Sequence, residues 1–368
     1  MVSGKNSRTT PAWIFGLGLW SVAFWGLLRL VPLTEAGPFE PEEIRASALM
    51  ARAIAALREH RDAFGPPIDA RFDLNRTGLI GLENSLITTS LGHLEAKRTA
   101  ADPLVAGAVV RMFREAGLGR GDLAAVGASS SFPGLILATL SAAEALGVKP
   151  LLISSLGASN WGGNNPEWTW LEMSDCLRKN GLLDVRPVAL SIGGEEDSGR
   201  DMTGEGREFL GRRIRETGLP FLQETNLIQT VRERIDVLEK HAGGAPIKAF
   251  VNIGGSWANM GTDGEVLKLR PGFNPASEVV VPPPGRRGLI QEMAGRGIPV
   301  IHLLFVKGLC GRYGLPWDPV PLPDPAKAAA AAGAGKPRLP GLIIVAVYLV
   351  GMCLGLGRIA RKNLRLGT

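Results

Sequence analysis

The chain has 368 residues, of which 45% are apolar and 21% charged, a composition typical of globular proteins and not of disordered or fibrous ones. Its net charge of +6 comes from the two ends, because 7 of the 41 basic residues lie in 1–29 and 358–368, where no acidic residue occurs. The rest of the chain is nearly neutral. A nucleic-acid-binding domain carries its basic charge on the folded part, so this distribution argues against nucleic acid as a partner.

Two uncharged apolar segments lie near the ends of the chain. The first runs from Ala12 to Leu28 and resumes after Arg29, and the second covers Leu339 to Gly357. Each approaches the roughly 20 residues that a helix needs to cross a bilayer. Basic residues flank both segments on the side of the chain terminus, so the positive-inside rule predicts two spans of the cell (inner) membrane with both termini cytoplasmic. The predicted organisation is a tail and first membrane helix (1–33), an extracytoplasmic domain (34–317), a Pro/Ala-rich tether (318–338), a second membrane helix (339–357) and a basic cytoplasmic tail (358–368).

Three features of these ends leave alternatives open. The first apolar segment could be a cleaved signal peptide, although Thr34–Ala36 is a poor small-x-small cleavage site. Gly351 and Gly355 form a GxxxG spacing, which lets two membrane helices approach closely and would suit dimerisation. Of the three cysteines, Cys176 and Cys310 could form a disulfide in an oxidising compartment, but two cysteines alone give no framework, and we expect free buried thiols.

The region between the apolar segments alternates strands and helices. A helix is expected first over 41–64, opened by Pro41 and two glutamates and leading from the membrane to the domain. Continuous apolar runs then predict buried strands at 122–127, 149–154, 185–192, 247–253 and 298–305, with helices at 135–147, 169–181, 204–217, 224–240 and 288–294. Such runs separated by helices are typical of a parallel sheet covered on both faces. The sequence therefore predicts an α/β, doubly wound, mostly parallel sheet.

Four of the predicted strands end in loops rich in Gly, Ser and Asn. In open α/β sheets, ligands bind beyond the carboxyl ends of the strands, where glycine permits close approach and Ser and Asn supply neutral hydrogen-bonding groups. The sequence therefore predicts a binding pocket for a small molecule or a polymer end at this edge. The candidate binding residues are Ser129, Ser130, Ser131, Ser159, Asn160, Asn164, Gly193, Gly194, Asn252, Gly254, Gly255 and Ser256.

The three consecutive serines are also weak candidates for a nucleophile. Ser131 stands at a strand–turn–helix junction, but GASSSFPG does not match the GxSxG elbow, and we expect instead that one of these serines caps the following helix. His302 lies in an apolar strand, where a structural histidine is more common than a base. No HExxH, CxxC, GxGxxG or P-loop pattern occurs, so we expect no metal ion and no cofactor.

A polar segment precedes the first predicted strand. Residues 81–99 combine Glu83, Thr88 and Thr89 with the adjacent cations Lys97 and Arg98. The two cations could bind a carboxylate or form a solvated helix face.

Four stretches together resemble the poly-γ-glutamate system protein family: ENSLITTSLGHLEAKRTAADP, GDLAAVGASSSFPGLILATLSAAEALG, SSLGASNWGGNNPEWTWLEM and KAFVNIGGSWANMG. These are membrane-anchored proteins encoded with bacterial genes for poly-γ-glutamate synthesis and export. The resemblance covers about residues 40–310 and implies a role in making, exporting or anchoring this capsule polymer. It carries no molecular activity and no catalytic residues.

Three functions compete at this stage. In the first, which leads, the protein is a non-enzymatic or accessory component of polymer biosynthesis or export whose pocket holds the polymer end or a partner membrane subunit of the synthase or exporter. The second is an extracytoplasmic serine-dependent hydrolase or transferase acting on γ-glutamyl amide bonds, which would require Ser129, Ser130 or Ser131 within reach of His302, Asp175 or Lys97. The third is an anchored binding module for a transporter, whose signature would be two lobes around a cleft.

Overall fold

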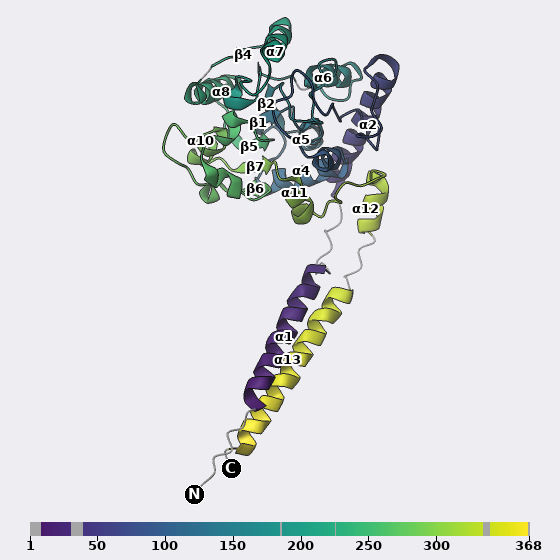
Figure 1. The fold of residues 1–368 in the computed structure, drawn as a ribbon, viewed down its shortest axis with the longest axis vertical. Coiled ribbons are helices and arrows are strands. Elements are labelled where there is room, and N and C mark those ends of the chain that lie inside the picture. Colours follow the sequence, from purple (N-terminus) through teal and green to yellow (C-terminus); the bar gives the residue numbers. More distant parts are fainter. Residues whose placement is uncertain (1–8, 31–39, 185, 225, 334–338, 367–368) are drawn as a thin grey trace. The chain divides into compact units, whose positions relative to one another are not determined.

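The computed structural model describes residues 9–30, 40–184, 186–224, 226–333 and 339–366. Contacts between residues divide the chain into two units, Phe39–Ala329 and a second made of Met1–Pro38 with Ala330–Thr368. The first unit, called the α/β domain below, holds all seven strands of the described residues (Figure 1).

The strands form one sheet in the order β4-β3-β2-β1-β5-β7-β6, with β1 at its centre. From β1 the chain builds outward to β4, and then returns to the other side of β1 with β5 and β7. All pairings are parallel except that of β6 with β7. The strands are β1 (Leu123–Ser129), β2 (Lys149–Ser155), β3 (Ala189–Ser191), β4 (Phe221–Leu222), β5 (Ile247–Ile253), β6 (Gly272–Asn274) and β7 (Val300–Leu303).

Helices cover both faces of the sheet, as the α/β prediction requires. Along β1, Ala124 and Val126 belong to one core cluster and Ala125 to the other, because successive side chains of a strand point to opposite faces. The first cluster includes residues of α2 (Pro41–Phe64), α4 (Leu104–Glu115), α5 (Pro133–Leu146), α6 (Trp170–Lys179), α7 (Gly204–Glu216) and α11 (Val306–Tyr313). The second includes residues of α8 (Leu227–Ala242), α9 (Trp257–Met260) and α10 (Leu289–Gly295). The expectation of an α/β fold with a mostly parallel sheet is confirmed.

Helix α2 has the predicted bounds. It packs against α4 and α5, and its side chains Met50 and Leu57 are fully buried. The apolar residues at helical spacing therefore face a protein core, and α2 is an integral part of the α/β domain.

Several elements are absent from the predictions. These are the short strands β4 and β6, the short helices α3 (Leu94–Ala100) and α11, and the 12-residue helix α4; in addition, β3 covers only part of 185–192. Strands of two or three residues are too short to show an alternating pattern. The expected tether contains a helix, α12 (Pro325–Gly333), while 334–338 lie outside the described residues.

The second unit contains α1 (Thr9–Leu30) and α13 (Leu339–Leu366), which pack against each other. Gly351 and Gly355 face α1, since a Cβ on them would lie 3.0 Å from Trp20 Nε1 and 2.6 Å from Leu17 Cδ2. The GxxxG spacing thus serves packing within one chain. Across the residues that the structure describes, no helix is long and apolar enough to cross a membrane. The two predicted membrane spans remain a prediction.

Candidate functional site

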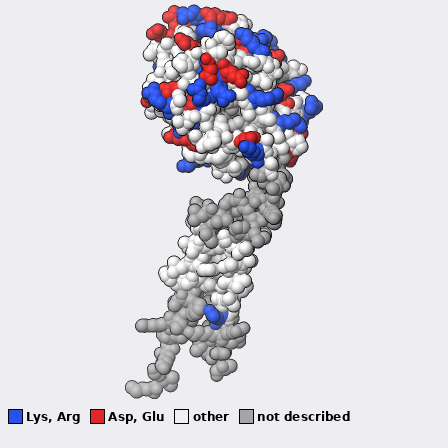
Figure 2. Space-filling model, turned by 90° about the vertical axis from the view of Figure 1, so that its right-hand side faces the viewer, with Lys and Arg blue, Asp and Glu red and all other residues white. Residues whose placement is uncertain are grey.

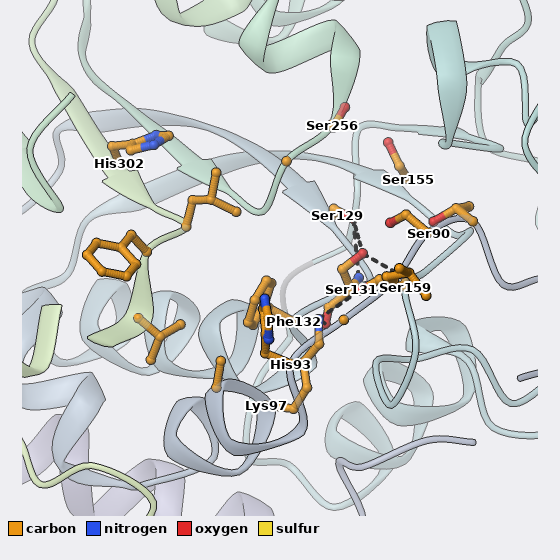
Figure 3. A pocket seen from close by; sticks show the side chains of 18 of the residues that line it. Ser90, His93, Lys97, Ser129, Ser131, Phe132, Ser155, Ser159, Ser256 and His302 are labelled. Atoms are coloured by element: carbon orange, nitrogen blue, oxygen red, sulfur yellow. Dashed lines mark hydrogen bonds between the residues drawn. The ribbon is translucent and has the colours of Figure 1, made fainter. Parts of the chain in front are cut away.

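A cavity of about 750 Å³ lies at the carboxyl ends of the central strands. Residues that follow β1 and β5 line it, and these are the neighbouring strands from which the chain proceeds in opposite directions. Such a switch point is where open α/β sheets bind ligands. The cavity's polar lining includes Ser90, Lys97, Ser129, Ser131, Ser159 and Ser256 (Figure 3).

The serines after β1 form a hydrogen-bonded turn at the cavity wall. Ser131 Oγ accepts a hydrogen bond from Ser129 Oγ at 2.9 Å and another from the backbone N–H of Ser159 at 3.0 Å. With both acceptor sites filled, the Ser131 hydroxyl proton is left to be donated, and the cavity is where a ligand oxygen could receive it. The expectation of a serine cap is wrong, because Phe132 holds the N-cap position of α5 and no side chain caps it.

Lys97 reaches the same wall from α3. Its Nζ donates to the carbonyl oxygen of Ser131 at 2.5 Å and to Ser159 Oγ at 2.8 Å, and it lies 3.6 Å from the centre of the Phe132 ring. Among the described residues, no carboxylate forms an ion pair with it. Burial therefore lowers the pKa of Lys97 to about 7, while the face of the aromatic ring favours the ammonium. Both protonation states are accessible near neutral pH.

Arg98 faces away from this cluster. Its guanidinium donates to both carboxylate oxygens of Asp318, at 2.7 and 2.5 Å, and it does not line the cavity. This pair attaches the segment around Asp318 to α3. The two adjacent cations predicted to act together therefore have separate roles.

Asn160 and Asn164 hold the backbone instead of lining the cavity. Asn164 receives the N–H of Leu82 at 2.9 Å and donates to its carbonyl at 2.8 Å, and Asn160 accepts the N–H of Gly92 at 3.0 Å. The segment 82–92 is thereby fastened to the loop after β2. This contact places Ser90 and Gly92 at the cavity although no strand precedes them.

Near the end of β5, Asn252 and His302 form a second cluster of hydrogen-bonded polar side chains. Asn252 donates to the carbonyl of Gly254 at 2.9 Å and contacts His302 Nδ1 at 3.0 Å, and burial lowers the pKa of His302 to about 4. Gly254 has φ +83°, and Gly255 lines the cavity. Ser256 also lines it, and the Ser256 hydroxyl is buried with no hydrogen-bond partner in the described part of the chain.

A buried ion pair lies beneath the ends of β2 and β3. Arg234 of α8 is fully buried and contacts Asp197 at 2.5 Å, and its Nη2 donates to Ser191 Oγ at 2.8 Å and Ser155 Oγ at 3.2 Å. Gly193 has φ +83° beside Ser155, and Gly194 lines the cavity. The hydrogen bonds of this network fix the position of Ser155, which lines the cavity.

The outer part of the cavity is apolar. Leu91 is 93% exposed and Phe305 62%, and both line the cavity together with Trp257, Trp317 and Leu267. Leu91, Leu267, Phe305 and Trp317 were not predicted as site residues. His93 lies in the polar segment 81–99, and Ser155 and Trp257 lie in the predicted strand-end loops, but none of the three was singled out.

The structure thus gathers part of the predicted set at one site. Ser129, Ser131, Ser159, Gly194, Gly255, Ser256 and Lys97 line the cavity; Ser130, Asn160, Asn164, Gly193, Asn252, Gly254 and Arg98 do not. No hydroxyl of Ser129–Ser131 is hydrogen-bonded to His302, Asp175 or Lys97 among the described residues, and His302 lies across the cavity from the serines (Figure 3).

Among the described residues, no three His, Cys, Asp or Glu side chains are placed to hold a metal ion. Cys176 and Cys310 are buried and free.

Comparison of the chain with protein-family models, with curated proteins and with solved structures finds no match.

Proposed function

We propose that the cavity binds the end of a γ-linked glutamate chain, and that the protein is a membrane-anchored accessory component of poly-γ-glutamate synthesis or export. The observation that carries the proposal is the Ser131 hydroxyl, which accepts two hydrogen bonds and keeps its proton for a ligand oxygen. The partnerless Ser256 hydroxyl and the Lys97 amine add two further donors. A chain end of this polymer offers carboxylate and amide oxygens as acceptors.

A single chain end suits the surface better than a long stretch of polymer. Basic and acidic residues are interspersed on the face of the α/β domain in Figure 2, with no continuous basic stripe. A polyanion held along its length would call for such a stripe. The apolar rim of the cavity also favours a single chain end, because the exposed side chains of Leu91 and Phe305 cannot form hydrogen bonds or ion pairs with a row of carboxylates.

The membrane placement rests on the sequence. The uncharged segments 12–28 and 339–357, each with basic residues on the terminal side, would anchor the chain and leave the α/β domain outside, where an exported polymer or its membrane subunits are met. Reporter fusions at Gly65 and at Thr368 should give outside and inside locations, respectively. An outside report at Thr368 would overturn the two-span arrangement.

The binding claim is tested with the full chain purified in detergent. Calorimetry with γ-linked triglutamate should detect binding, with α-linked triglutamate binding more weakly. Ser131→Ala should lower the affinity about tenfold, the loss expected for one hydrogen bond to a charged group. Ser174→Ala, a change on the surface of α6, is the matched control. Thermal melting checks that Ser131→Ala remains folded, and an unchanged affinity in the folded variant would refute the proposed site.

The process is tested in cells. Deletion of the gene, with polymer measured separately inside and outside, should reduce polymer outside the cell. If the amounts of polymer inside and outside the cell were unchanged, the proposed role in poly-γ-glutamate synthesis or export would be refuted.

A further inference from the structure

Ser159 and Lys97 form a hydroxyl–amine pair at the cavity wall. Their side-chain atoms Oγ and Nζ lie 2.8 Å apart, and both residues line the cavity. The two residues are 62 positions apart in the sequence and come from the loop after β2 and from α3. Hydrogen-bond contact between a serine hydroxyl and an amine is the arrangement by which serine is activated when no histidine is available.

Both members are held in place by their surroundings. The backbone N–H of Ser159 is fixed to Ser131 Oγ, and a second N–H of the Lys97 amine is fixed to the Ser131 carbonyl. Gly92 lies directly behind them, because a Cβ there would approach Ser159 Oγ and Lys97 Cε at 3.3 Å each. The 2.8 Å contact is therefore set by packing from two sides.

The Lys97 amine can act as a base because no carboxylate among the described residues stabilises its protonated form by an ion pair; its hydrogen-bond acceptors are a carbonyl and a hydroxyl. Arg234, the other buried cation of this region, is paired with Asp197, whereas no described carboxylate pairs with Lys97. Burial brings the pKa of Lys97 to about 7, so a neutral amine is populated under ordinary conditions. In the neutral state, rotation about the terminal C–N bond lets Nζ accept the Ser159 hydroxyl proton across the same 2.8 Å contact.

We propose that Ser159 is a nucleophile and Lys97 its general base, and that the cavity cleaves carboxamide bonds through an acyl-enzyme. The choice of a γ-glutamyl amide as substrate rests on the proposed function. The nucleophile is not one of the three consecutive serines considered from the sequence. The Ser131 hydroxyl, with its proton free and its Oγ bonded to the Ser159 N–H, is placed beside the reacting carbonyl as a donor to the oxyanion.

The reaction balances with water as the only co-reactant. Ser159 Oγ attacks the carbonyl carbon while its proton passes to the neutral Lys97 amine. The tetrahedral intermediate collapses with cleavage of the C–N bond, and the leaving amine takes the proton from Lys97. Water then attacks the Ser159 ester, gives its proton through Lys97 to Ser159 Oγ, and releases the carboxylic acid.

The test uses the full chain in detergent with two substrates, γ-linked triglutamate and the activated ester p-nitrophenyl acetate. Both should be hydrolysed, and a serine-directed fluorophosphonate should label Ser159, located by mass spectrometry. Ser159→Ala should lose the label and roughly 10³-fold or more of the hydrolysis rate. Lys97→Arg, which keeps the charge but cannot become a neutral base, should lose hydrolysis as well. Ser174→Ala is the matched control.

The outcomes separate the two proposals. Ester hydrolysis that depends on Ser159, without action on triglutamate, keeps the catalytic pair and overturns the γ-glutamyl substrate. Binding of triglutamate by calorimetry, with no hydrolysis of either substrate, keeps the binding function and overturns the catalytic pair. Hydrolysis that survives Ser159→Ala also overturns it. In the wild type, kcat/KM should rise with pH through about 7 as Lys97 loses its proton.

Discussion

Two buried cations near the carboxyl edge of the sheet have opposite environments. Arg234 is fully buried against Asp197 and two serine hydroxyls, so its charge is compensated by a carboxylate. Lys97 is 4% exposed and contacts a carbonyl, a hydroxyl and an aromatic ring, with no carboxylate among the described residues. One cation belongs to a closed network inside the domain, and the other lines the cavity.

The difference shows how burial acts on an ionisable group. A buried charge with a full partner keeps its charge and becomes part of the framework, whereas a buried amine without one lowers its pKa and can exchange a proton. The Arg234–Asp197 pair therefore stabilises the strand ends next to the cavity, and Lys97 is a cavity-lining group whose pKa of about 7 suits proton exchange. This comparison makes three predictions for the chain.

The largest effect is expected from breaking the compensated pair. Asp197→Ala would leave the Arg234 guanidinium buried without its carboxylate, and the free energy of unfolding should fall by about 3–5 kcal/mol in urea denaturation. Asp175→Ala, which breaks two solvent-accessible pairs with Arg178 and Lys179, should cost less than about 1 kcal/mol. Replacing both members, Asp197→Leu with Arg234→Met, should cost less than Asp197→Ala alone. Equal losses for Asp197 and Asp175 would show that the buried pair is not a structural element.

The uncompensated amine should make stability depend on pH. The pKa of Lys97 is about 7 in the folded protein and ordinarily 10.5, so between these values the unfolded chain binds a proton that the folded protein does not. The free energy of unfolding of the wild type, relative to Lys97→Met, should therefore rise with pH from 7 to 10, by at most about 1.4 kcal/mol per pH unit. Urea denaturation across this range measures it.

The matched variant for this series is Lys149→Met, at the exposed start of β2. This variant measures what the loss of a solvent-exposed lysine does to the free energy of unfolding. A difference for Lys97→Met that does not exceed the difference for Lys149→Met at any pH would mean that the Lys97 amine keeps an ordinary pKa, and the contrast with Arg234 would then fail.

The smallest effect concerns the Ser256 hydroxyl, which has no hydrogen-bond partner among the described residues. Ser256→Ala should change the free energy of unfolding by no more than about 0.5 kcal/mol, because no hydrogen bond of the folded protein is lost. Its affinity for γ-linked triglutamate should fall a few-fold. Ser154→Ala removes another buried hydroxyl without a partner, one that does not line the cavity, and should leave the affinity unchanged. Equal affinities in the two variants would place Ser256 outside the binding site.

Long elements with a strong apolar pattern were predictable from the sequence. Helix α2 begins at Pro41 and ends at Phe64 as predicted, and β5 covers the predicted 247–253. A continuous apolar run in a doubly covered sheet must be buried on both faces, so its limits can be read directly. The location of a cavity at the strand ends follows from the same reasoning, because parallel strands bring their carboxyl ends to one edge.

The roles of individual side chains at that edge were decided by tertiary contacts. Lys97 and Arg98 are neighbours in the sequence, yet adjacent residues of a helix point in different directions, so one amine enters the cavity and the other cation binds Asp318. Asn160 and Asn164 look like binding residues until the segment 82–92 is seen against them.

What the sequence alone determined is therefore the α/β class, the order of the long strands and helices, and the edge of the sheet at which the cavity lies. Only the tertiary structure brought Ser159 to Lys97, Arg234 to Asp197, and the spare proton of Ser131 to the cavity. The physical reason is that apolar periodicity is a local property carried by each segment. A hydrogen bond between residues 62 positions apart, or the pKa of an amine, depends on which segments pack together and on what else is buried there.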